Sequence, residues 1–220
     1  MSSEALVLTV DGIPVRPVTV EVAPGIQITI LDASVTDTRL EQAVDDDSVD
    51  PYASTLWPSS IALAGELPGL VSPGSTVLDL GAGTGLATLT AAHLGAWATA
   101  YDHDELALRL IEEAARSQGL EVETALFDLH SREALPPADL VVVADLFYDH
   151  DLAHAVARRV IAQVERGGIA LVADPGRVAS ADFHRYLERR GLSGRFHTVE
   201  VSPPGPDERP IGIEIHLFGD

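Results

Sequence analysis

A glycine-rich turn follows a short apolar run near residue 80. The run Thr76 to Leu80 leads directly into the turn, and the residues after the turn have a helical pattern. Glycines permit a tight turn and a close approach of the backbone to a ligand at the N-terminus of a helix. We therefore expect a nucleotide-like ligand here, contacted by Asp79, Gly81, Ala82, Gly83 and Gly85.

The spacing of the glycines restricts the ligand. A turn that binds the pyrophosphate of a dinucleotide has a third glycine three residues after the second, and this chain has Leu86 at that position. The sequence also lacks an evident pair of catalytic residues for hydride transfer. Both observations argue against an NAD-dependent oxidoreductase and favour a ligand without a pyrophosphate.

Two later carboxylates follow the ends of apolar runs. Asp102 comes about 20 residues after the turn, where a carboxylate can accept hydrogen bonds from both hydroxyls of a ribose. Asp128 follows the next run and could accept a hydrogen bond from an adenine amino group, with Leu129 against the ring. His103 lies beside the ribose carboxylate and is a further candidate contact.

Each of these residues also has a purely structural interpretation. Asp79 and Asp102 could cap turns, and Asp128 could be a helix N-cap or a loop carboxylate. His103 and His130 could lie in solvated loops. The sequence leaves both interpretations open.

Alternating strands and helices are required to bring these residues together. Helical spacing of apolar residues appears at 57–67, 86–93, 107–119, 152–160 and around Phe183 to Leu187. Strand-like runs cover 76–80, 96–101, 122–127, 138–144, 169–173, 195–201 and 211–218. This order predicts an α/β, Rossmann-like, doubly wound fold with a seven-stranded, mostly parallel sheet and an antiparallel C-terminal hairpin strand. Ligands then bind at the carboxyl ends of the strands.

The first 55 residues have a different pattern. Three β-rich runs at 6–10, 15–22 and 26–31 are separated by Asp11-Gly12 and Pro24-Gly25, and an acidic, loop-like stretch follows at 34–51. We expect an N-terminal β-strand appendage and acidic loop over 1–55, and a ligand-binding domain over 56–220.

Composition restricts the partners. The net charge of −20 repels phosphate backbones and acidic membranes and attracts cations, so we expect neither nucleic acid nor membrane as a partner. The sequence has no long apolar run and no signal-like start, so we expect a soluble, cytoplasmic protein.

The absence of cysteine excludes thiolate metal ligands. His150 and His154 are four residues apart on a helical segment, as metal ligands can be, but no Glu completes a zincin motif and no third ligand is evident. We expect no metal site.

Three further motifs carry a resemblance to a known family. They are Leu56 to Ala64, which contains Trp57; Ala144 to Asp149, which contains an Asp-x-x-Tyr motif; and Asp174 to Arg177. Together with the glycine turn they resemble the seven-β-strand (class I) methyltransferases that use S-adenosylmethionine (SAM). Within that class the chain is similar to the protein lysine methyltransferase group that includes the electron-transfer flavoprotein β-subunit lysine methyltransferase.

The resemblance implies roles for particular residues. SAM is then the cofactor and S-adenosylhomocysteine the product, Trp57 contacts the cofactor, and Asp145 and Tyr148 lie where methyl donor and acceptor meet. Asp145 could hold an incoming ammonium, and Tyr148 could offer its ring face and hydroxyl. Structural alternatives are that Asp145 caps the next helix, that Tyr148 packs at the sheet rim, that Trp57 is a core aromatic, and that Arg177 forms a surface ion pair.

The resemblance implies an enzyme that methylates an amine nitrogen, and a lysine side chain of a protein substrate is the acceptor we expect. N-methylation of a small amine or heteroaromatic molecule is an alternative. A SAM-binding protein without transferase activity is another, because a fold and a cofactor site do not establish turnover.

Overall fold

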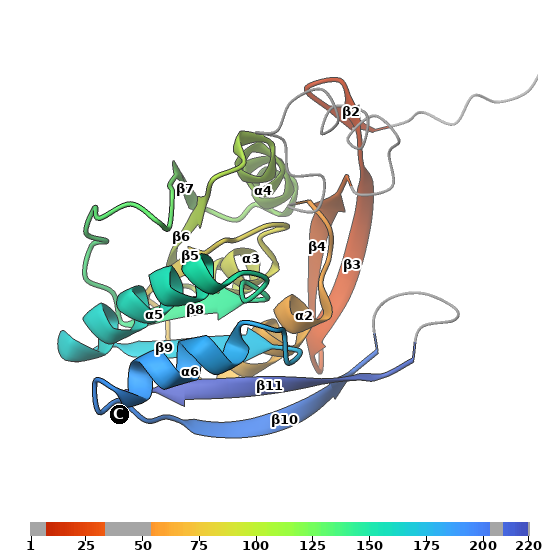
Figure 1. The fold of residues 1–220 in the computed structure, drawn as a ribbon. Helices are drawn as coiled ribbons and strands as arrows, with labels where there is room; N and C mark the ends of the chain where they lie inside the picture. Colours follow the sequence, from red (N-terminus) through yellow and green to blue (C-terminus); the bar gives the residue numbers. More distant parts are fainter. Residues whose placement is uncertain (1–7, 34–53, 203–208, 220) are drawn as a thin grey trace, which may run out of the picture.

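A seven-stranded sheet forms the centre of the protein in the computed structural model, which describes residues 8–33, 54–202 and 209–219 (Figure 1). The strand order is β10-β11-β9-β8-β5-β6-β7. The parallel strands are β5 (Thr76–Leu80), β6 (Trp97–Asp102), β7 (Glu123–Leu126), β8 (Leu140–Ala144) and β9 (Ile169–Asp174). From β5, the strands are added on one side as β6 and β7 and on the other as β8 and β9, so the switch point at which this architecture binds ligands lies between the parallel strands β5 and β8.

The two C-terminal strands complete the sheet. β10 (Arg195–Val201) and β11 (Ile211–Phe218) form an antiparallel hairpin, and β11 also pairs antiparallel with β9. The later strand therefore lies inside the sheet and the earlier one lies at its edge. The seven-stranded, mostly parallel sheet with an antiparallel C-terminal strand, expected from the sequence, is confirmed.

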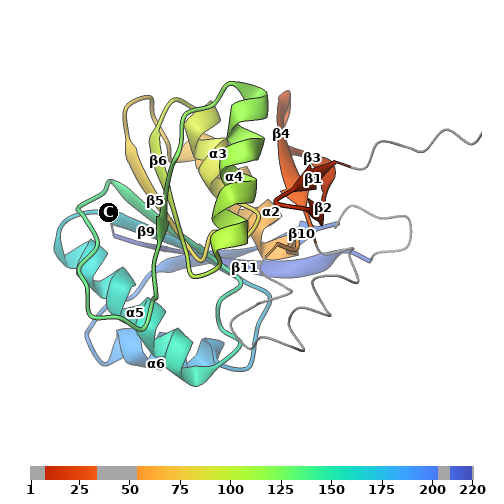
Figure 2. The same ribbon diagram turned by 90° about the horizontal axis from the view of Figure 1, so that it is seen from above.

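Helices cover both faces of the sheet (Figure 2). One face carries α5 (His150–Glu165) and α6 (Ser180–Glu188). The other face carries α2 (Pro58–Glu66) with the short 3-10 turn η1 (Leu67–Gly69), α3 (Leu86–His93) and α4 (Glu105–Gln118). β8 alternates between the two layers, since Val141 and Val143 pack with α5 and α6 whereas Val142 packs with α2 and α3.

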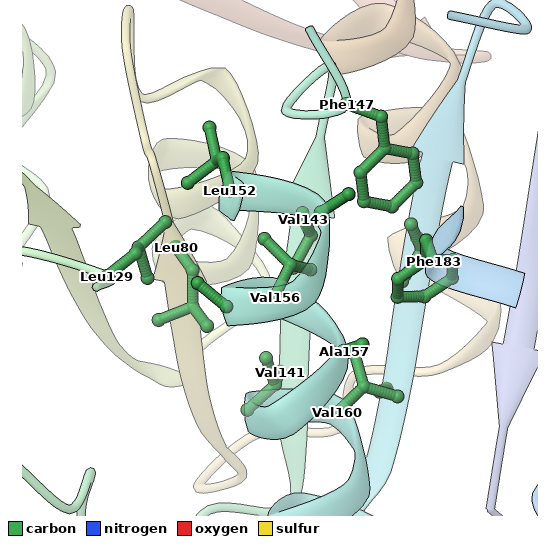
Figure 3. Packing of buried hydrophobic residues seen from close by; sticks show 14 of the residues in the cluster. Leu80, Leu129, Val141, Val143, Phe147, Leu152, Val156, Ala157, Val160 and Phe183 are labelled. Atoms are coloured by element: carbon green, nitrogen blue, oxygen red, sulfur yellow. The ribbon is translucent and has the colours of Figure 1, made fainter. Parts of the chain in front are cut away.

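The α5–α6 layer has an aromatic centre (Figure 3). Phe147 and Phe183 are fully buried and stack with ring centroids 4.4 Å apart. Leu80, Val143 and Val156 belong to the same buried cluster. This packing fixes the carboxyl ends of β5 and β8, after which the predicted site residues follow.

The N-terminal strands form two small sheets beside α3 and α4. β1 (Thr9–Val10) pairs with β2 (Ile13–Pro14), and β3 (Arg16–Ala23) pairs with β4 (Ile26–Asp32). The fully buried Ile28 and Ile30 of β4 share a hydrophobic cluster with Leu86 and Leu110. The β3–β4 hairpin thus shares a core with the sheet domain, and the expected boundary at residue 55 stays a prediction.

Several element boundaries differ from those expected. The strand expected over 15–22 is β3, Arg16–Ala23, and the N–H of Val15 instead donates to the Leu8 carbonyl next to the β1–β2 pair. α2 begins at Pro58 because Trp57 has an extended backbone, and proline suits the first helical position. α5 begins earlier than expected because the Asp149 carboxylate caps it.

Two expected segments fall in parts of the chain that the structure does not describe. The acidic stretch at 34–51 lies outside the described residues, as do residues 203–208 of the Pro-rich turn. Among the helices that are described, none combines the length and the apolar character needed to cross a membrane.

Candidate functional site

A cavity of about 720 Å³ lies at the carboxyl ends of β5, β6 and β8 and beside the segment after β7. Its volume falls within the range of about 300–1,000 Å³ usual for small-molecule sites. It brings together nine of the residues expected from the sequence, namely Trp57, Gly81, Gly83, Asp102, His103, Asp128, Leu129, Asp145 and Tyr148. Asp79, Ala82 and Gly85 are not among its lining residues.

The glycine turn forms one wall of this cavity. Gly81 has φ +67°, and a Cβ atom there would lie 2.8 Å from the Leu146 side chain. The N–H groups of Gly81 and Ala82 both donate to the Tyr101 carbonyl, at 2.8 and 3.1 Å. A residue without a side chain therefore allows Leu146 to pack directly on a turn that is tied to the end of β6.

Gly85 lies away from the lining of the cavity. It is the N-cap of α3 with φ +71°, and a Cβ atom would lie 2.4 Å from Cγ1 of Ile111 in α4. Ala82 is buried in the same cluster as Ile111. These two turn residues therefore support the close packing of α4, whereas Gly81 and Gly83 face the cavity.

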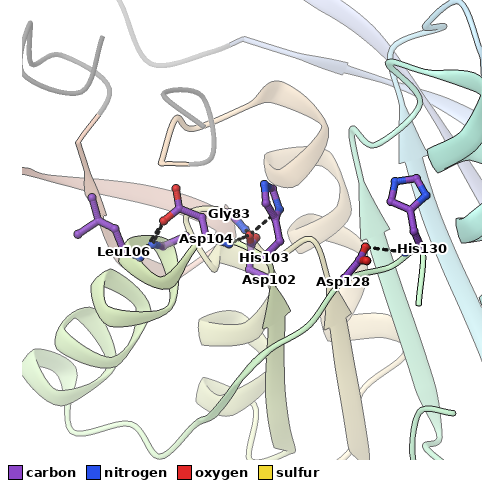
Figure 4. Close-up of polar contacts among 8 residues, drawn as sticks. Gly83, Asp102, His103, Asp104, Leu106, Asp128 and His130 are labelled. Carbon is purple, nitrogen blue, oxygen red and sulfur yellow. Dashed lines mark hydrogen bonds and ion pairs between the residues drawn. The ribbon is translucent and has the colours of Figure 1, made fainter. Parts of the chain in front are cut away.

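Asp102 connects the glycine turn to the end of β6 (Figure 4). Its Oδ2 accepts a hydrogen bond from Gly83 N–H at 2.8 Å, and its Oδ1 accepts one from Asp104 N–H at 2.9 Å. The side chain is buried but lines the cavity. Each carboxylate oxygen can accept a second hydrogen bond, so holding the turn and binding a ribose are compatible.

Helix α4 is capped by a neighbour of Asp102. Oδ1 of Asp104 accepts hydrogen bonds from Leu106 and Ala107 N–H, at 2.7 and 3.3 Å. His103 is exposed, with Nδ1 3.4 Å from Oδ1 of Asp102. Asp102 is therefore not the helix cap, and its carboxylate remains directed toward the turn and the cavity.

Asp79 lies behind the turn. Its Oδ2 accepts hydrogen bonds from the N–H and hydroxyl groups of Thr88, at 3.1 and 2.8 Å. Burial raises the pKa of Asp79 to about 6, against the opposing effect of the Thr88 hydrogen bonds. The residue joins β5 to α3 and does not line the cavity.

The segment after β7 supplies a mixed polar and apolar wall. Asp128 is exposed, and its Oδ1 accepts a hydrogen bond from His130 N–H at 2.8 Å (Figure 4). Leu129 is buried, and the Phe127 ring meets Tyr101 edge-on at 5.4 Å between centroids. An exposed carboxylate beside apolar side chains suits an adenine ring with its amino group.

Asp145 follows β8 in an unusual backbone conformation. It has φ +61°, in the left-handed region that non-glycine residues seldom adopt. Its carboxylate is buried, accepts a hydrogen bond from the Ser59 hydroxyl at 3.2 Å, and contacts Nε of Arg177. Asp149, not Asp145, caps α5. Such local strain is typical of functional sites.

Arg177 joins Asp145 to Trp57. Its side chain is 30% exposed, whereas that of its partner Asp145 is 4% exposed, so the pair is not an ordinary surface ion pair. The guanidinium carbon lies 5.4 Å from the Trp57 ring centroid. Trp57 is partly exposed and lines the cavity, so it is not a core aromatic.

The remaining expected residue, Tyr148, lies at the cavity rim. Its side chain is about half exposed and lines the cavity just before α5. The cavity thus has a glycine turn and Asp102 on one side, and Asp145 with Tyr148 on the other.

A second cavity of about 730 Å³ shares Trp57, Asp145 and Arg177 with the first. It extends to the β3–β4 hairpin, where Arg16 and Asp32 are part of its lining. Neither residue was expected at the site from the sequence. A hairpin centred on Pro24-Gly25 places 16 opposite 32, so their opposite charges were the available signal.

Ser59 was also missed, although it lies two residues after Trp57. Its relative exposure is 0%, and its hydroxyl hydrogen bonds to Asp145. Ser59 is three and four residues before the apolar Ala62 and Leu63, so it lies on the same helix face, and a hydroxyl on a buried face needs a polar partner. That spacing is the signal that could have identified it.

The histidines considered as metal ligands have other contacts. His150 Nδ1 pairs with the Asp182 carboxylate, and the His154 ring packs on Tyr186. Elsewhere in the described part of the chain, potential ligand atoms of His184, Glu214 and His216 lie within 4.8 Å of one another. None of these three lines the first cavity.

Comparisons with known proteins identify relatives. A family model described as a methyltransferase domain matches residues 77–168. The electron transfer flavoprotein beta subunit lysine methyltransferase of Mus musculus is 34% identical over 165 residues, covering 73% of this chain and 62% of that protein. The Danio rerio protein of the same name is 32% identical over 152 residues, covering 67% and 58% respectively. This chain thus spans about six tenths of the length of these relatives.

The fold is likewise found among solved structures. A TehB-like SAM-dependent methyltransferase from Corynebacterium glutamicum superposes with a TM-score of 0.57 at 16% identity, covering 83% of this chain and 95% of that one. At this identity the likeness concerns the fold alone.

Proposed function

The chain contains a domain of the class I SAM-dependent methyltransferases, and from this premise we propose that it methylates an amine nitrogen, namely a lysine side chain of a protein. The observation that carries the proposal is the strained, buried Asp145, which lines both cavities at once. A carboxylate at the junction of a nucleoside-sized cavity and a second open cavity suits the point where donor and cationic acceptor meet.

The residues of the first cavity fit SAM. Asp102 would accept hydrogen bonds from the ribose hydroxyls, the Gly81–Gly83 backbone would lie against the nucleoside, and Asp128 with Leu129 would receive the adenine. Gly81 has no side chain, and a Cβ atom there would meet Leu146, so the backbone of the turn itself forms this side of the cavity. When bound, SAM supplies a methyl group on a sulfonium, which a neutral amine takes with release of S-adenosylhomocysteine.

The protein's own contribution is positioning. A lysine ammonium with a pKa near 10.4 binds to the Asp145 carboxylate and then loses a proton to water before its lone pair is available. Tyr148 presents its ring and hydroxyl at the same rim, where it limits the orientation of the amine. The protein then accelerates methyl transfer by aligning the amine nitrogen with the methyl group, and it needs no dedicated general base.

Two observations favour a protein lysine as the acceptor. The two relatives described above, from Mus musculus and Danio rerio, are named as lysine methyltransferases. The net charge of −20 attracts a basic protein surface. A small amine is the second candidate, since the chain spans only part of the length of those relatives.

The experiment is incubation of the purified protein with radiolabelled SAM and a lysate of the organism that encodes it. A discrete labelled protein band containing methyl-lysine is the expected result, and Asp145→Asn serves as the transfer-deficient control. Label confined to small molecules would replace lysine with a small amine. SAM binding without any labelled product would identify a binding protein and refute transfer.

A further inference from the structure

The second cavity begins where the cofactor cavity ends. Trp57, Asp145 and Arg177 line both of them, so these three side chains form the boundary between the two spaces. The far wall of the second cavity comes from the β3–β4 hairpin, which is outside the family model's match to residues 77–168. The hairpin therefore shapes a space that adjoins the reacting end of the cofactor cavity.

The lining of this second cavity suits a long side chain with a cationic end. Apolar groups from Pro17, Val18, Leu56 and Pro175 line it, and they can pack against a methylene chain. The buried carboxylates of Asp32 and Asp145 also line it, and each is paired with an arginine of the same lining, Arg16 and Arg177 respectively.

Arg177 makes the two interactions that a cationic acceptor would make at the boundary. Its Nε contacts the buried Asp145 carboxylate, and its guanidinium carbon lies 5.4 Å from the Trp57 ring centroid. A buried carboxylate without a cation is strongly destabilised, so the site requires a positive charge when no acceptor is present. The partial exposure of Arg177 leaves it a path toward solvent.

We propose that the second cavity is the passage by which the acceptor lysine reaches the methyl donor, and that Arg177 holds the cation position at Asp145 and Trp57 until the lysine displaces it. This inference rests on the proposed function. It adds the route of the lysine, through the second cavity, and the group that competes with it, Arg177. Exchange of one cation for another keeps the Asp145 carboxylate paired until the bound lysine loses its proton. Arg177 is accordingly a positioning residue that also selects against weakly bound acceptors.

Cation binding can be tested without methyl transfer. The chain has two tryptophans, and Trp97 is 68% exposed, so Trp97→Phe leaves Trp57 as the single fluorescent reporter. We expect n-butylammonium to change its fluorescence, and 1-butanol not to. Arg177→Met should tighten n-butylammonium binding by about tenfold, because the competing cation is gone, and Asp145→Asn should abolish it. Equal affinity in the parent and Arg177→Met proteins would overturn the displacement.

The passage itself can be blocked. Thr19 is an exposed residue of the hairpin that lines the second cavity, and Gln27 is an exposed residue of the same hairpin that does not. Thr19→Trp should lower lysine methylation by at least about tenfold with unchanged S-adenosylhomocysteine affinity, and Gln27→Trp should change neither. Thermal unfolding of both variants verifies that they are folded.

The outcomes separate the two proposals. Unchanged lysine methylation by Thr19→Trp would overturn the passage and leave the proposed function standing. If the unsubstituted protein binds S-adenosylhomocysteine but methylates no lysine, the proposed function fails. The fluorescence titration then still decides whether Asp145 and Trp57 form a cation site guarded by Arg177.

Discussion

The Asp102 carboxylate accepts a hydrogen bond from the Gly83 N–H at 2.8 Å, so the end of β6 holds the glycine turn that follows β5. The same carboxylate lines the cofactor cavity. One side chain thus fixes the shape of the turn and faces the position expected for the ribose.

Replacement of Asp102 should therefore affect cofactor binding above all. We expect Asp102→Ala to weaken S-adenosylhomocysteine binding by on the order of 100-fold, since hydrogen bonds to a charged group contribute roughly 1.5–3 kcal/mol. Calorimetric titration measures this. Asp139→Asn is a matched control, because Asp139 also accepts a backbone hydrogen bond, from Thr76 N–H, away from the cavity. Similar affinities for all three proteins would contradict the role of Asp102.

The acceptor side should behave differently. Asp145→Asn keeps a residue type that tolerates a positive φ and removes the charge, and Tyr148→Phe removes one hydroxyl. We expect both variants to bind S-adenosylhomocysteine within about threefold of the parent while methyl transfer falls by at least about tenfold. Kinetic constants for the labelled acceptor measure the loss. A parallel loss of cofactor affinity would mean that donor and acceptor residues are not separated as proposed.

Asp79 should make stability depend on pH. Its pKa rises from 3.8 in the unfolded chain to about 6 in the fold, so the folded state binds the proton more tightly. The resulting stabilisation is complete below pH 3.8 and is lost as the pH rises to about 6. In the parent protein we expect this effect to lower the free energy of unfolding by at most roughly 3 kcal/mol between pH 4 and pH 7.5. Asp79→Asn should remove this part of the pH dependence. Urea unfolding at the two pH values measures it, and identical pH dependence in the two proteins would contradict the prediction.

The turn should not tolerate a side chain at Gly85. Gly85→Ala introduces a Cβ 2.4 Å from Ile111 Cγ1 at a φ of +71°, so we expect a loss of about 2–5 kcal/mol in unfolding free energy. Gly119→Ala is a close control, because Gly119 has φ +67° but no atom within 4 Å of the added Cβ. It should lose only about 1–2 kcal/mol. If both variants lose the same unfolding free energy, the contact with Ile111 does not contribute to the effect at Gly85.

The sheet and the cofactor side could be predicted because their determinants are local. Asp102 ends a strand about 20 residues after the glycine turn, and parallel strands bring their carboxyl ends to one edge. Asp79 was also expected beside the ligand. Its side chain alternates with that of Leu80 and points toward α3, where it meets Thr88 rather than the cavity.

The acceptor side depends on contacts between distant segments. Asp145 meets Ser59 and Arg177, which are 86 and 32 residues away in the sequence. The position of the β3–β4 hairpin depends on packing of Ile28 and Ile30 against α3 and α4. No local spacing specifies such contacts, so the second cavity could not be predicted from motifs.

The placement of β11 between β9 and β10 has a consequence during synthesis. Both neighbours make their hydrogen bonds to β11, which follows them along the chain. A nascent chain that extends only through β10 therefore presents an unpaired edge of β9, and β10 has no partner strand. Unpaired strand edges associate readily with other chains, so we expect this region to be prone to aggregation until β11 has left the ribosome.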